Sequence, residues 1–167
     1  MNRIQFARLS TALAAVLAAP LALAAPDTAT LTVNATVSGI CKMSLVGGPM
    51  AFTLDPSTLV NATSNVVTAS YKCTKGTPAT SFTVGGAAGG TYTSGATAAL
   101  GALLGPTAAD LIPYSIDWTV PAAFTGTGFG VGSGSRDVAL TGTILNANFT
   151  NAAAGAYTNT VAITVNY

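Results

Sequence analysis

The chain has 167 residues, of which 50% are hydrophobic and 7% are charged, and its formal net charge is +1. It contains no histidine and no glutamate, which removes the commonest general base and the commonest metal ligand. The few lysines and arginines form no cluster that would attract nucleic acid or anionic lipid. The composition therefore disfavours an enzyme, and it gives no reason to expect a cofactor or a metal ion.

The first residues are typical of a secretory signal peptide. Arg3 and Arg8 precede a short apolar stretch, and the small-residue site Ala22-Leu23-Ala24 follows it. The stretch is shorter than the roughly 20 apolar residues that a membrane-spanning helix needs. We expect cleavage after this site, which leaves a signal peptide, 1–24, and one domain of ordinary size, 25–167. The mature chain then has four cations against five aspartates, a net charge of minus one, and no membrane span.

Segments of alternating apolar and polar residues recur along the mature chain, and turn residues separate them. This is the pattern of an all-β sandwich or barrel. The first segment, Thr30 to Cys41, places apolar side chains on one face of an extended strand. Further strands are predicted over Met50 to Leu54, Asn65 to Cys73, Thr80 to Val84, Pro113 to Val120, Asp137 to Leu145 and Tyr157 to Tyr167, and the last has the clearest alternation.

The connections carry turn signals of several kinds. Asp55-Pro56-Ser57 and the segment 75–78 are predicted turns, and the Ala- and Leu-rich segment 96–104, flanked by glycines, is predicted as a loop or a single turn. The glycine-rich runs 85–90 and 126–134 lack lysine and lead into no helix, so long hairpin loops explain them better than phosphate-binding loops do.

Two strands carry side chains that we assign to the core. Tyr114, Ile116 and Trp118 share one face, and Val138, Leu140 and Thr143 are predicted to share another. Tyr114 and Trp118 also suit a sugar-binding site, but their alternation inside a strand favours core packing.

Cys41 and Cys73 are the two cysteines of the chain. In an exported protein a disulfide is the default interpretation of such a pair. Closing a loop of about 32 residues should stabilise the fold by roughly 3–4 kcal/mol in the chain-entropy model. A reactive thiol pair would favour a Cys-x-x-Cys spacing or a neighbouring base, and neither is present.

Several of these patterns, taken in order, are similar to the spore coat protein U domain family, which includes the subunits of archaic chaperone–usher pili. The chain departs from the family at Asn159, where Asp is frequent, and in the run 126–134, which lacks the frequent Trp and Asp. The similar features are Cys41 after the leading strand, Phe52 before an Asp-Pro turn, Cys-Thr-Lys-Gly-Thr-Pro at 73–78, Leu-Ile-Pro-Tyr-Ser-Ile at 111–116 and Gly-Ala-Tyr-Thr-Asn-Thr-Val at 155–161.

The resemblance implies an incomplete immunoglobulin-like β-sandwich that lacks its final strand and leaves a hydrophobic groove. A periplasmic chaperone fills that groove first, and the N-terminal segment of a neighbouring subunit fills it in the fibre. Covering an apolar sheet edge in this way removes an aggregation hazard. The expected donor segment, about 25–37, directs Leu31, Val33, Ala35 and Val37 inward, and the expected chaperone-pairing strand contains Val161, Ile163, Val165 and Tyr167.

The sequence therefore predicts a structural subunit of a bacterial surface pilus. It would be exported through the periplasm to the cell surface, pass an outer-membrane usher and polymerise by donor-strand exchange with copies of itself or related subunits, supporting adhesion or biofilm formation. The alternatives are a secreted coat protein and a sugar- or surface-binding adhesin module that acts through the runs 85–90 and 126–134. A secreted hydrolase is least favoured, because its catalysis would rest on Asp and Ser alone.

Overall fold

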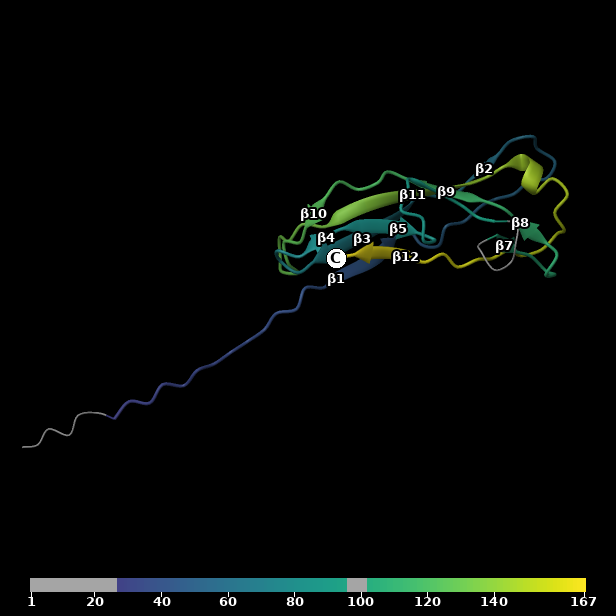
Figure 1. The fold of residues 1–167 in the computed structure, drawn as a ribbon. Coiled ribbons are helices and arrows are strands. Elements are labelled where there is room, and N and C mark those ends of the chain that lie inside the picture. Colours follow the sequence, from purple (N-terminus) through teal and green to yellow (C-terminus); the bar gives the residue numbers. More distant parts are fainter. Residues whose placement is uncertain (1–26, 96–101) are drawn as a thin grey trace, which may run out of the picture. The chain divides into compact units, whose positions relative to one another are not determined.

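The computed structural model describes residues 27–95 and 102–167, which form β-strands and one short 3₁₀ turn (Figure 1). The predicted signal peptide and most of the segment 96–104 lie outside these residues. The elements are Cys41–Val46 (β1), Ala62–Thr63 (β2), Val67–Cys73 (β3), Pro78–Ala79 (β4), Ser81–Val84 (β5), Thr91–Thr93 (β6), Leu103–Leu104 (β7), Leu111–Ile112 (β8), Ser115–Trp118 (β9), Phe124–Thr125 (β10), Arg136–Ile144 (β11), Asn146–Asn148 (η1) and Ile163–Asn166 (β12).

The larger sheet is antiparallel, with the strand order β1-β3-β11-β9-β6, and β2 pairs with one end of β11. Alternate residues of its strands are buried, as expected for a sheet with one face on a core. The buried residues on this face are Val67, Ala69, Tyr71 and Cys73 of β3, Val138, Leu140, Gly142 and Ile144 of β11, and Ile116 and Trp118 of β9.

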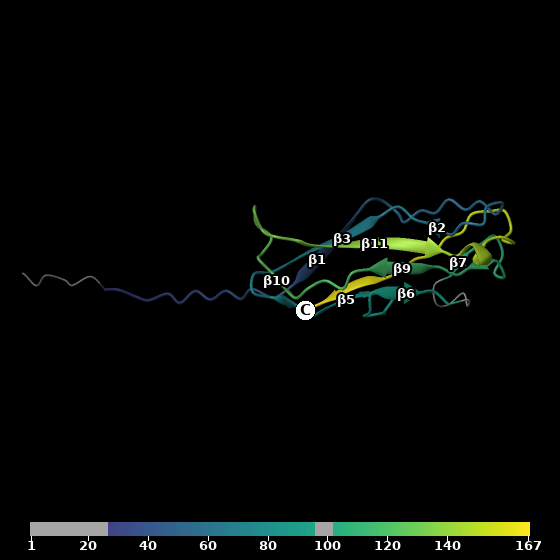
Figure 2. The same ribbon diagram turned by 90° about the horizontal axis from the view of Figure 1, so that it is seen from above.

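A second layer packs on this face. It is built around the antiparallel pair β12–β5, and the short pairs β10–β4 and β7–β8 lie outside the larger sheet (Figure 2). Phe82 and Val84 of β5 are buried, and Ile163 and Val165 of β12 pack against the same core. The predicted all-β class is confirmed, and the two layers are compatible with an immunoglobulin-like sandwich.

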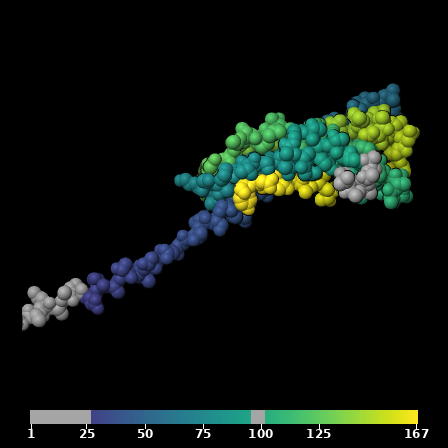
Figure 3. Space-filling view, in the orientation of Figure 1, coloured from purple at the N-terminus to yellow at the C-terminus, as the bar shows by residue number. Residues whose placement is uncertain are grey.

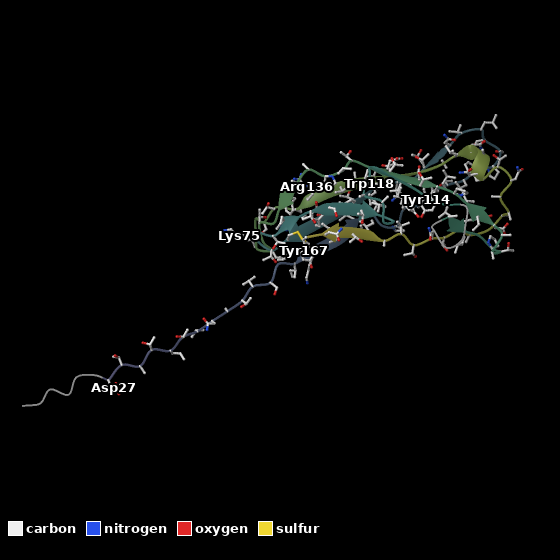
Figure 4. The ribbon with its side chains drawn as sticks, in the orientation of Figure 1. Asp27, Lys75, Tyr114, Trp118, Arg136 and Tyr167 are labelled. Carbon is white, nitrogen blue, oxygen red and sulfur yellow. A yellow bond between two sulfur atoms is a disulfide. The ribbon has the colours of Figure 1, made fainter. Side chains whose placement is uncertain are left out.

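Aromatic rings join the two layers. Phe82 of β5 stacks on Tyr71 of β3, with ring centroids 6.2 Å apart, and meets Trp118 of β9 edge-on at 6.4 Å. Trp118 and Tyr114 are only 6% and 5% exposed, and they lie inside the domain (Figure 4). Core packing, which their alternation predicts, is therefore confirmed.

The predicted first strand is wrong in its position. Residues 27–40 form no strand, and β1 begins at Cys41 and continues to Val46. An isolated extended segment has no ladder to stabilise it, whereas 41–46 finds a partner in β3. The alternation of residues 31–37 thus indicated a tendency to form a strand and gave no information on where its partner is.

The alternation also predicts a strand over Met50 to Leu54, but the structure shows no ladder there. The side chains of Met50, Phe52 and Leu54 nevertheless alternate into the core. Phe52 and Met50 pack over Gly142 of β11, where any side chain would collide with them. The predicted periodicity is therefore real, but the segment is held by side-chain packing and not by a neighbouring strand.

Three smaller predictions are also wrong. Thr143 faces away from the core, and Ile144 occupies the buried position beside it. Leu103–Leu104 forms β7, where a loop was expected. The glycine-rich run 85–90 connects β5 to β6, and the run 126–134 connects β10 to β11. In each case the two strands belong to different sheets, so neither run is a hairpin loop. The period-2 pattern alone does not reveal which strands become neighbours.

Candidate functional site: the groove between β1 and β12

On one side of the sandwich, two neighbouring strands each have an unpaired edge. Within the part of the chain that the structure describes, β1 pairs only with β3 and β12 only with β5. Both strands approach each other on this side of the domain (Figure 1). Each therefore presents a row of backbone groups with no sheet partner.

The direction of these backbone groups follows from the register. The N–H of Gly85 donates to the carbonyl of Ala162 at 2.8 Å, so the even-numbered residues of β12 turn toward β5. Because successive residues of a strand point their backbone groups to opposite sides, Ile163 and Val165 direct theirs toward the open edge. Their side chains also pack against the core. Apolar side chains and unpaired backbone groups therefore lie along the same line.

The segment that leads into β12 has the same asymmetry. Leu104 and Thr158 exchange two backbone hydrogen bonds, of 2.8 and 3.0 Å, on the side away from the open edge. Farther along the chain, β5 pairs with β12 on the side away from the open edge. One side of the closing segment from Thr158 to Asn166 is thus covered by backbone partners at both ends, and the other side is left open.

A groove with a cavity of about 280 Å³ lies between the two edges, and we call it the β1–β12 groove. The closing segment borders it, and this segment, yellow in Figure 3, is exposed along one side of the domain. Its lining is largely apolar. One wall consists of Leu45, Gly48, Pro49 and Met50, the other of Asn159, Thr160, Val161 and Ile163, and the remaining lining residues are Val67, Leu103, Tyr114, Ile116 and Leu140.

The first wall is fixed by the side chain of Asn65. Its Nδ2 donates to the carbonyls of Gly47 and Pro49, at 3.1 and 3.2 Å, and its Oδ1 accepts the N–H of Ala51 at 2.7 Å. These bonds satisfy backbone groups that have no ladder partner. The side chain of Asn65 therefore holds the bent backbone of this wall in place.

The polar side chain of Asn159 lines the groove. Asn159 Nδ2 donates to the hydroxyl of Tyr114 at 2.7 Å, and its Oδ1 accepts the N–H of Thr160 at 2.7 Å. Burial raises the pKa of Tyr114, and the hydrogen bond from Asn159 opposes this effect in part. No sequence pattern indicates this pair, because the two residues are 45 positions apart.

The predicted donor residues do not lie in any strand. Leu31, Val33 and Val37 are 86%, 81% and 81% exposed, and Ala35 is exposed as well. Single apolar residues at a surface are ordinary, but four at every second position leave an entire strand face without cover.

The structure places the C-terminal limit of this segment. Thr74 Oγ1 donates to the carbonyl of Ser38 at 3.3 Å, and the N–H of Ile40 donates to Thr74 Oγ1 at 3.1 Å. A side chain at Gly39 would also collide with Thr77. Residues from Ser38 onward are therefore bound to their own domain, and Val37 is the last residue before this bound part of the chain.

The predicted disulfide between Cys41 and Cys73 is confirmed. Cys73 is fully buried and Cys41 is half-buried. The bond joins the first residue of β1 to the last residue of β3, so it fixes one end of the strand that borders the groove.

The predicted closing-strand residues have different positions. Val161, Ile163 and Val165 are half-buried, and Tyr167 is exposed.

Among the described residues, no group of three or more metal-ligating side chains gathers, and no helix is long and apolar enough to span a membrane.

These observations define a class of protein: a disulfide-bonded β-sandwich with two unpaired edges beside an apolar groove. The chain belongs to the spore coat protein U domain family, whose model matches residues 27–164. This is a family of surface-associated proteins that includes subunits of chaperone–usher pili. No curated protein and no solved structure gives a significant match to the chain.

Proposed function

We propose that this protein is a structural subunit of a bacterial surface fibre, assembled by donor-strand exchange. The observation that carries the proposal is a complementary pair of features in one chain. The β1–β12 groove offers apolar side chains and free backbone groups along one line. The segment before Ser38 offers an uncovered strand face with the same period of two.

Filling the groove with that segment from another copy satisfies both features. Burial of Leu31, Val33 and Val37 should contribute about 1.5–3 kcal/mol each, and each new backbone hydrogen bond about 0.5–1.5 kcal/mol. Together these amounts are comparable with the whole stability of a domain. The contact joins the segment before Ser38 of one copy to the groove of the next copy. Because these are two different surfaces, the contact is heterologous and propagates into an open filament.

The same groove needs cover before assembly. We propose that a periplasmic chaperone supplies a strand to the open edge of β12, and that an outer-membrane usher exchanges it for the donor segment of the next subunit. Val161, Ile163, Val165 and Tyr167 are the residues that the chaperone strand would meet. An uncovered apolar edge would otherwise pair with other exposed edges and aggregate.

The test is electron microscopy of the producing cells with and without this gene, combined with antibody labelling against the chain. We expect labelled fibres that disappear with the gene. A smooth coat that carries the label, with no fibres, would instead favour the alternative of a secreted coat protein.

A surface-binding role has one observation in its favour. Phe129 and Val131 are exposed in the run 126–134, at positions flanked by glycines. Apolar side chains on such a loop can contact a hydrophobic surface. If they do so, Val131→Ser should reduce the attachment of cells while leaving the number of fibres unchanged.

A further inference from the structure

The polar side chain of Asn159 lies in the largely apolar β1–β12 groove. Among the odd-numbered residues from 159 to 165, Asn159 is polar and the other three are aliphatic. Its amide is fixed at both ends, by the Tyr114 hydroxyl and by the N–H of Thr160. Displacing the amide would leave the hydroxyl of Tyr114, a residue only 5% exposed, without its partner. These two bonds therefore hold the amide in its part of the groove.

Of the four inward-facing residues Leu31, Val33, Ala35 and Val37, one is small. Ala35 stands between Val33 and Val37, and Leu31 is the largest of the set. A leucine or valine opposite Asn159 would have to displace the amide or leave the groove. Alanine needs no such displacement, and it lets the larger side chains meet the aliphatic part of the wall.

We propose that the pair Asn159–Tyr114 sets the register of donor-strand exchange between copies of this chain, by admitting Ala35 of the next copy opposite Asn159. The inference depends on the proposed function and adds to it the position at which the two copies align. The donor lies antiparallel to β12. The register pairs Ala29 with Val165, Leu31 with Ile163, Val33 with Val161, Ala35 with Asn159 and Val37 with Tyr157.

The connection at Ser38 supports this direction. In the antiparallel register Val37 lies opposite Tyr157. The residues after Val37 belong to the folded domain of the donor copy, which therefore lies beyond this end of the groove. A parallel donor with Ala35 opposite Asn159 would place Gly39 opposite Ile163. Residues from Ser38 onward are bound through Thr74 to the folded domain of the donor copy. That domain would then have to occupy the groove.

The test is a set of paired cysteines in the full chain, examined in fibres from the producing cells. Opposed residues of an antiparallel pair have Cα atoms about 4.5–5.5 Å apart, within the range of a disulfide. Val33→Cys with Val161→Cys leaves Asn159 intact and should give a ladder of covalent multimers without reductant. Leu31→Cys or Ala35→Cys, each combined with Val161→Cys, tests the registers shifted by two residues and should give no ladder.

The role of Asn159 is tested by adding a second change. Asn159→Val should reduce the ladder from the pair 33–161 and create one from the pair 35–161, because the polar position no longer selects alanine. Thr164→Val, at an exposed position on the opposite face of the same segment that does not line the groove, is the matched control and should leave the ladder unchanged. A ladder from 33–161 that persists in full with Asn159→Val would overturn the proposal.

A second measurement needs no added cysteine. Ala35→Leu should lower the temperature at which fibres dissociate, and Asn159→Ala in the same chain should restore it by making room. Failure to restore it would also overturn the register. If unaltered cells carry no fibres of this chain, the proposed function fails; if fibres form but cross-link through 31–161 or 35–161, only the register fails.

Discussion

Cys41 and Cys73 lie directly opposite each other in the register of β1 and β3, with Cα atoms 4.0 Å apart and their sulfurs bonded. β1 has no other strand partner among the described residues. Without the disulfide, only the ladder with β3 would hold this strand. The bond therefore anchors a strand that borders the groove.

Removing the disulfide should destabilise the domain. We expect Cys41→Ala with Cys73→Ala to lower the free energy of unfolding by about 3 kcal/mol, since the unfolded chain gains the freedom of the opened loop. Chemical denaturation of the chaperone-free domain measures this. Ser44→Ala, at an exposed position of β1, is the control and should change stability by less than about 0.5 kcal/mol. Two reactive thiols in the unaltered, non-reduced protein would contradict the prediction.

The donor segment should be sensitive on one face only. Val33→Asp should abolish or strongly reduce fibres, because it places an unpaired charge in an apolar groove. Thr32→Asp adds the same charge on the opposite face and should be mild. Fibre yield and heat resistance are the measurements. Equal values for both variants would contradict the donor-strand proposal, since both positions are exposed before assembly.

The closing strand should be required before assembly. Deleting Val165 to Tyr167 removes half of β12 and part of its pairing with β5, so the chaperone loses the edge that it would cover. We expect no accumulation in the periplasm, measured by immunoblotting of periplasmic extracts. Thr164→Ala, an exposed position of the same strand, should accumulate normally. Normal export and fibre yield from the truncated chain would count against the proposed chaperone contact.

Stability should fall at high pH. Burial raises the pKa of both Tyr71 and Tyr114. The unfolded state then loses these protons at a lower pH than the folded state does, so the stabilising effect is complete below about pH 10 and is lost as pH rises further. Tyr71→Phe should reduce this decline, as measured by denaturation at neutral pH and above pH 10. An unchanged decline would show that burial of Tyr71 has no part in it.

One glycine should tolerate no side chain. A Cβ at Gly126 would collide with the backbone carbonyls of Cys73 and Thr74, which cannot move without disturbing the end of β3. Gly126→Ala should therefore destabilise the domain by about 1–3 kcal/mol. Gly89→Ala has open space around it and should be nearly neutral. Equal melting temperatures for the two variants would refute the prediction.

The sequence alone determined the features that depend on local pattern and on chemistry. Alternation located β3, β9 and β11 closely, because a strand with one buried face must carry apolar residues at every second position. The two cysteines of an exported chain predicted their own bond. The motifs around Cys73 and Tyr114 indicated the family.

Only the tertiary structure decided which strands become neighbours and what each edge lacks. Alternation is the same in three segments with different surroundings. Among the described residues, Leu31 to Val37 have no strand partner, Met50 to Leu54 pack without a ladder, and β12 is paired on one side. The pair Asn159–Tyr114 could not be predicted, because contacts between distant residues depend on how the sheets are brought together. Local pattern fixes the face that a strand buries, and the chain's three-dimensional arrangement fixes what covers it.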